Sequence, residues 1–140
     1  MYMYFSNMPE VYMKKTVSAL IIAVLISVVP IFSFAEYNRE KVVQVMRDNV
    51  RLMGEASKAA KSENYVKAAE ALMELVQGMI EIKDYTAPRG SQADWNATND
   101  LFIRTAFQGI GACGNEDKDA LNSALKELQR LGSQGHRNHR

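Results

Sequence analysis

The fold is decided by residues 121–131, which read Leu-Asn-Ser-Ala-Leu-Lys-Glu-Leu-Gln-Arg-Leu. Apolar side chains recur there at steps of three and four residues, which is the spacing of one face of an α-helix. This row consists of Leu121, Ala124, Leu125, Leu128 and Leu131. A helix with one apolar face buries that face against other elements, so we expect the segment to belong to a packed helical domain.

Three upstream segments repeat this spacing. The first is expected over Arg39–Lys61, the second from an N-cap at Ser62 to about Asp84, and the third over Asp94–Ala112. The three expected buried rows are Val42, Met46, Val50, Met53, Ala56 and Ala60; then Val66, Ala69, Met73, Val76 and Ile80; then Trp95, Phe102, Ala106, Ile110 and Cys113. No run of the chain after residue 35 alternates as a strand does.

These four segments predict an all-α fold, an up-down-up-down antiparallel four-helix bundle. Helices of about 20 residues are each roughly 30 Å long, and helices of matched length with short connections favour that arrangement. The longest break is residues 85–91, which contain Pro88 and Gly90, and Gly114-Asn115 predicts a short turn. An antiparallel dimer of helical hairpins remains open.

The N-terminal part has the pattern of a secretory signal peptide. Lys14 and Lys15 precede a mostly apolar stretch, residues 16–34, which ends in Ser-Phe-Ala before Glu36. We expect cleavage after Ala35, with residues 1–12 an upstream extension, and in a bacterium this places the product in the periplasm. A retained membrane anchor is the alternative, because the stretch is long enough to span a bilayer, but Pro30 and the small residues at the end favour cleavage.

The expected domains are therefore the extension and signal peptide, 1–35, and a helical domain, 36–140. Cleavage removes Lys14, Lys15 and Glu10, so that the mature chain carries fifteen basic and fifteen acidic side chains. This balance argues against a nucleic-acid partner, and no membrane span is expected to remain. One cysteine excludes an internal disulfide, and the absence of a phosphate-binding loop or hydrolase motif predicts that the protein is not an enzyme.

The C-terminal tail carries the residues of chemical interest. Gly132 and Gly135 interrupt the last expected turns, and each costs about 1 kcal/mol of helix propensity relative to alanine. Fraying explains them simply, whereas a flat ligand against the helix would require side chains to be absent there. His136 and His139 are three residues apart and so share a helix face.

The predicted bundle brings the start of the first helix beside the end of the fourth. Met46, or with less support Met53, then lies across from His136. A thioether and an imidazole on opposing helices are an axial pair that can hold haem iron, and methionine raises its potential. Alone, Met46 reads as an ordinary core methionine, so the prediction rests on the pair.

The chain resembles the cytochrome b562 and cytochrome c′ superfamily over nearly all of residues 36–140. The four-helix pattern, the early methionine and the C-terminal ending carry this resemblance. In c-type members the ending is Cys-x-x-Cys-His-x-x-Tyr-Arg, and here residues 132–140 read Gly-Ser-Gln-Gly-His-Arg-Asn-His-Arg. The resemblance implies His136 as the fifth ligand and Met46 as the sixth.

The missing cysteines decide how a haem would be attached. Covalent attachment uses thioethers to the two cysteines before the ligand histidine, and both positions are glycine here. Cys113 is about 35 Å from His136 along a continuous helix and is expected to be a small buried apolar residue, with an intermolecular disulfide as the alternative. The expected cofactor is therefore haem b, and Arg140, with Arg137 or Arg130, could pair with a propionate.

Three functions follow from these observations. The first is a periplasmic electron-transfer protein with non-covalent haem b held by His136 and Met46, which exchanges electrons with redox partner proteins. The second is a haem-free bundle that binds a partner. The third is a metal-binding protein using His136 and His139, for which the sequence offers no third ligand. A homodimer is compatible with each of them.

Overall fold

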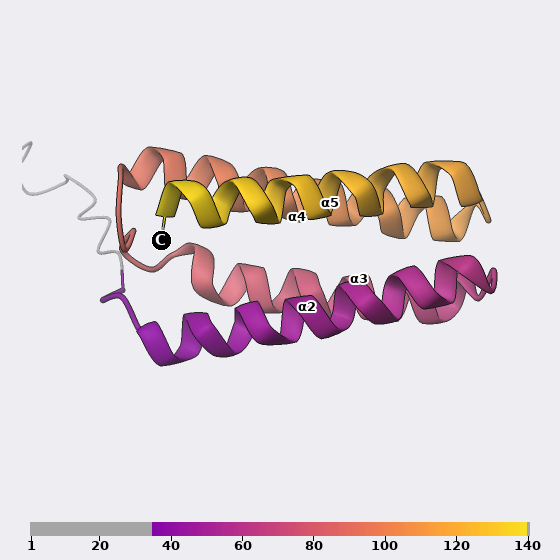
Figure 1. The fold of residues 1–140 in the computed structure, drawn as a ribbon, viewed down its shortest axis with the longest axis horizontal. Coiled ribbons are helices and arrows are strands. Elements are labelled where there is room, and N and C mark those ends of the chain that lie inside the picture. The colour runs from indigo at the N-terminus through magenta and orange to yellow at the C-terminus, as the bar shows by residue number, and fades with distance from the viewer. Residues whose placement is uncertain (1–34, 140) are drawn as a thin grey trace, which may run out of the picture. The chain divides into compact units, whose positions relative to one another are not determined.

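The computed structural model describes residues 35–139, without the side chain of His139. Its elements are α2 (Arg39–Lys61), α3 (Tyr65–Lys83), α4 (Gln92–Gly114) and α5 (Lys118–His139) (Figure 1). This range contains no strand, only an isolated bridge between Ala35 and Tyr85. The all-α class with four packed helices is confirmed, whereas the predicted signal peptide lies outside the described residues except for Ala35.

Short polar side chains fix where the helices begin. Asn38, Asn64 and Ser91 accept hydrogen bonds from the backbone N–H groups of Lys41, Lys67 and Asp94, respectively, and Asp117 does the same for Ala120. Each cap satisfies a donor that lacks a partner in the first helical turn. The expected N-cap at Ser62 is wrong, because Ser62 ends α2 and its hydroxyl donates to the carbonyls of Lys58 and Ala59.

Two connections are tight turns of the same design. Glu63, between α2 and α3, and Glu116, between α4 and α5, both have positive φ, at 56° and 53°. In each turn the N–H of the next residue reaches back to a carbonyl of the finished helix, Asn64 to Ala59 and Asp117 to Ala112, both at 2.9 Å. This is the pattern of a Schellman C-cap, and it reverses the chain within three residues.

The core is formed by one face of each helix; the expected row on α3 is largely wrong, and the expected row on α2 is wrong at Val50. The row on α5 is buried throughout, and the row on α4 is buried apart from the half-buried Ile110. On α2 and α3, however, Val50 and Val66 are 74% and 70% exposed. The buried positions there are Val42, Val45, Asn49, Leu52, Ala56, Ala59 and Ala60 on α2, and Ala68, Ala71, Leu72, Leu75, Val76, Met79 and Ile82 on α3.

Consecutive helices pack closely, but the first and last do not. The contacts between α2 and α3, α3 and α4, and α4 and α5 are extensive, whereas α2 and α5 touch at few points. The ion pairs Lys41–Glu81 and Arg51–Glu74 run in opposite order along α2 and α3. The bundle is therefore closed on three sides and looser on the fourth.

Ala35, the last residue of the predicted signal peptide, contacts the loop between α3 and α4. Its N–H donates to the carbonyl of Asp84 at 3.1 Å, and its carbonyl accepts from the N–H of Thr86 at 2.9 Å. None of the four helices described is long and apolar enough to cross a membrane.

Glu116→Gly should stabilise the fold. A residue with a Cβ in the left-handed region is strained by roughly 1–2 kcal/mol, and glycine relieves that strain while adding entropy to the unfolded chain. We expect the free energy of unfolding to rise by about 0.5–1 kcal/mol, measured by urea titration. Glu116→Ala is the control and should lack this gain; an equal gain would locate the effect in the carboxylate instead.

Candidate functional site

An ion pair joins α2 and α5 at one end of the bundle. The Nζ of Lys118, the first residue of α5, lies 2.6 Å from Oε1 of Glu63, just after α2. This hydrogen bond lowers the pKa of the Glu63 carboxyl and raises that of the Lys118 ammonium.

At the opposite end, where α2 begins and α5 finishes, the two helices diverge (Figure 1). Met46 lies in the first half of α2, seventeen residues before Glu63, and His136 lies in the last turn of α5, eighteen residues after Lys118. Counted from the ion pair, the two residues therefore lie at comparable distances along the two helices. Met53 is only ten residues from Glu63, which disfavours it as the opposing thioether.

The flank of α2 that faces away from α3 is apolar. Val45 points to α3, where its Cγ1 lies 3.2 Å from where a Cβ on Gly78 would stand. A helix turns 100° per residue, so Met46 lies on the other flank, on the side of α5. Met46 and Met53 are half-buried and pack against the core, whereas Val43 and Val50 are exposed. We call this set, with His136, the open face: Val43, Met46, Val50, Met53 and His136.

The end of α5 has small residues beside this face. α5 is helical to His139, so Gly132 and Gly135 do not break it. A Cβ at Gly132 would lie 3.9 Å from Phe102, and one at Gly135 would lie 3.6 Å from Thr98, both ordinary contacts with α4. Packing against α4 therefore does not require glycine at either position. His136 follows Gly135 on the flank away from α4, and its imidazole is exposed.

A buried amide lies inside the same end of the bundle. Asn99 on α4 is 3% exposed, and its Nδ2 has no hydrogen-bond partner among the described residues. It follows Thr98, the residue beside Gly135, and therefore lies at the end of the bundle where α5 finishes. The other deeply buried asparagine, Asn49, is 8% exposed, but its Nδ2 donates to Sδ of Met79 at 3.1 Å.

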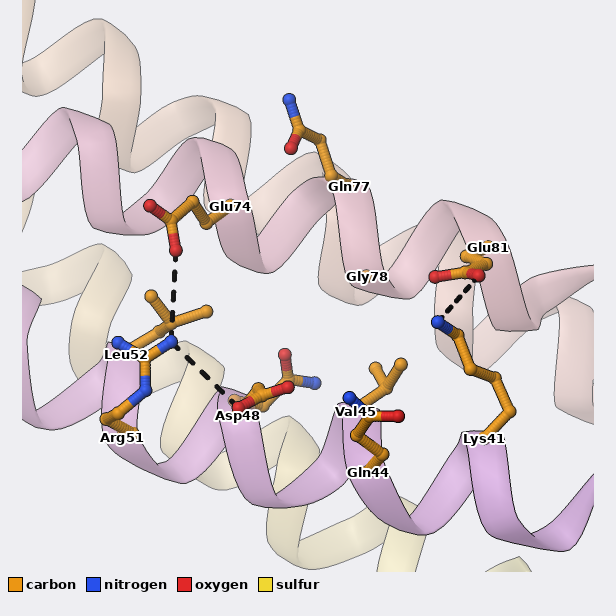
Figure 2. A pocket seen from close by; sticks show the side chains of 11 residues that line it. Lys41, Gln44, Val45, Asp48, Arg51, Leu52, Glu74, Gln77, Gly78 and Glu81 are labelled. Atoms are coloured by element: carbon orange, nitrogen blue, oxygen red, sulfur yellow. Dashed lines mark ion pairs between the residues drawn. The ribbon is translucent and has the colours of Figure 1, made fainter.

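A recess of about 450 Å³ lies between α2 and α3, away from the open face (Figure 2). Lys41 pairs with Glu81 at its one end, and Arg51 pairs with Asp48 and Glu74 at the other. The charged side chains that line it are thus paired with one another. Gly78 lines it as well, and the close approach of Val45 accounts for that glycine. Helix packing explains the recess without a ligand.

The remaining predicted site residues fall in three places. Arg140 and the side chain of His139 lie outside the described residues. Arg130 already forms two short hydrogen bonds with Glu127, at 2.6 and 2.8 Å, so Arg137, exposed in the last turn, is the better propionate partner of the two. Within residues 35–139 no three His, Cys, Asp or Glu side chains gather as a metal site would require.

Cys113 behaves as expected of a small apolar residue. It is 5% exposed, and burial raises the pKa of its thiol. A buried thiol with a raised pKa reacts slowly, because the thiolate is the nucleophile.

Comparison with known proteins gives no relative: no protein family, curated protein or solved structure matches the chain. The residues that sequence reasoning missed at this end are Asn99 and the exposed valines of α2. A polar residue inside the predicted row of α4, four positions after Trp95, was the signal for Asn99.

Gly132→Ala should stabilise the protein without ligand. Alanine favours a helix by about 1 kcal/mol over glycine, and its Cβ would meet only Phe102 at 3.9 Å. We expect a gain of about 0.5–1 kcal/mol in the free energy of unfolding of the ligand-free protein, read from chemical denaturation. A loss of stability would mean that α4 and α5 need the glycine after all.

Proposed function

We propose that the chain is a periplasmic electron-transfer protein built as an up-down-up-down bundle, with one non-covalent haem b held between α2 and α5. The Sδ of Met46 and an imidazole nitrogen of His136 would hold its iron. Bound there, haem b supplies a reversible one-electron change at its iron.

One observation supports this proposal: α2 and α5 touch at few points, and Met46 and His136 lie on these two helices at comparable distances from the Glu63–Lys118 pair. An axial pair needs two donor atoms from opposite sides of one metal ion, so the donors must come from facing elements at the same level. Met53 does not meet that condition.

The surrounding residues suit a flat apolar macrocycle. Val43 and Val50 expose apolar surface on α2 that a ring in the opening would cover, and each buried Å² of such surface contributes about 25 cal/mol. Side chains at Gly132 and Gly135 would face Phe102 and Thr98 of α4, and in the resemblance to c-type cytochromes these two positions are those of the cysteines. Without those thiols the ring is held by axial bonds and burial, and Arg137 is available for a propionate carboxylate.

Titration of the purified chain with haemin tests the proposal. We expect one equivalent to give a six-coordinate low-spin spectrum, and acid acetone to extract all the haem. His136→Ala and Met46→Ala should each change that spectrum to a five-coordinate one, because one axial donor is lost.

Met73→Ala serves as the matched control, because Met73 is 52% exposed on α3 and takes no part in the open face. It should titrate like the wild type. An unchanged spectrum in His136→Ala, or the same loss in Met73→Ala, would contradict the assigned ligands, and a chain that stays colourless would exclude the haem proposal.

A second candidate is a haem-free bundle that binds a protein partner. The observation in its favour is a row of exposed apolar residues spaced by seven on α3: Val66, Met73 and Ile80. Such spacing keeps side chains on one line of a helix, as in helix–helix recognition. This function predicts no haemin spectrum, together with loss of the partner or of self-association in Met73→Glu, measured by sedimentation.

Export with cleavage after Ala35 forms part of the proposal. The basic start, apolar stretch and Ser-Phe-Ala ending support it. We expect the intact mass of the periplasmic protein to correspond to a chain beginning at Glu36. Cleavage there also removes the two backbone hydrogen bonds that Ala35 forms with Asp84 and Thr86. A full-length chain recovered with membranes would instead support a retained anchor.

A further inference from the structure

The interior near the open face contains a donor that the fold itself does not use. Asn99 Nδ2 is enclosed and lacks a hydrogen-bond partner among the described residues, and a buried donor without a partner destabilises the folded state. The other deeply buried asparagine, Asn49, does have a partner, because its amide donates to Met79. The lack of any such partner at Asn99 therefore needs a cause of its own.

The position of Asn99 supplies that cause. Thr98, the neighbour of Asn99, lies against Gly135 near the end of α5. The contacts Lys41–Glu81 and Trp95–Lys83 place the start of α2 at the same end of the bundle. An unpartnered donor, two glycines that α4 packing does not require and an apolar flank of α2 thus occur at the same end of the bundle. Each is unfavourable or unnecessary for the fold alone, and a molecule bound inside that end would account for all three.

We infer that Asn99 is a binding residue, whose side-chain amide donates a hydrogen bond to the ligand held beside the open face. The ligand class is a flat, largely apolar ring with a hydrogen-bond acceptor on its periphery, and a porphyrin fits it. This inference rests on the proposed function for the choice of ring, but it does not require an iron or either axial ligand.

The variant Asn99→Leu tests whether the Asn99 amide binds the ligand or is only a buried polar group that the fold tolerates. Leucine has a similar size and no donor, so the ligand-free variant should melt at least about 4 °C above the wild type. Its affinity for haemin, and for iron-free protoporphyrin IX measured by fluorescence, should fall at least tenfold. Asn49→Leu is the matched control: it removes a buried amide that has a partner, should not raise the melting temperature, and should bind both rings as the wild type does.

The outcomes distinguish this inference from the proposed function. Wild-type protein that binds both rings, with Asn99→Leu binding them equally well, overturns the role of Asn99 and leaves haem binding intact; a buried water that satisfies the amide would give this result. Protoporphyrin IX binding that depends on Asn99, without axial ligation of haemin, supports the inference and overturns the ligand assignment. If neither ring binds to the wild type, both proposals are wrong.

Discussion

The close approach of α2 and α3 at Gly78 sets the orientation of α2 and, with it, the open face. A Cβ on Gly78 would lie 3.2 Å from Val45, tighter than most side-chain contacts, so the two helices are as near as a missing side chain permits. With Val45 and Leu52 turned to α3, the next residues around the helix, Met46 and Met53, lie on the opposite flank. α2 therefore presents large apolar side chains to a neighbour, α5, that it scarcely touches.

The two turns with a left-handed residue, at Glu63 and Glu116, set how the helices that they join are aligned along their axes. Because Glu63 and Glu116 each reverse the chain within three residues, the helices they join start level with one another. The Glu63–Lys118 pair brings the two turns together at one end. Differences between the helices then accumulate at the other end, where α2 begins and α5 finishes.

Much of the fold could be predicted from the sequence, and the errors in the expected buried rows of α2 and α3 have one cause. The bounds of α2 agree with the spacing, and the row on α5 is buried as expected, since its leucines are both large and inward. On α2 and α3 the search for large apolar residues selected Val50 and Val66, which are exposed. Several buried positions that the expected rows left out are alanines: Ala59, Ala68 and Ala71, each at most 7% exposed. Small residues permit close helix packing, but in a sequence they do not stand out as a row.

For the candidate site, chain lengths alone predicted that Met46 and His136 would be near one another in level. Spacing alone could not show that His136 is exposed or that Asn99 lacks a partner, because these depend on how far α5 lies from α2 and on which side chains enclose α4. The glycines could be interpreted only once the distances to Thr98 and Phe102 were known. α5 continues to His139, so the two glycines do not end the helix.

Exposed apolar surface alone is weak evidence for a ligand, because most of a folded protein's surface is apolar. The row Val66, Met73 and Ile80 on α3 illustrates this, since no buried donor without a partner is described beneath it. At the end of the bundle that contains the open face, the apolar flank coincides with the buried Asn99 and with glycines that packing does not require. Residues that are unfavourable for folding are expected to cluster at functional sites. That coincidence, rather than the exposure of any single valine, is the reason to place the function between α2 and α5.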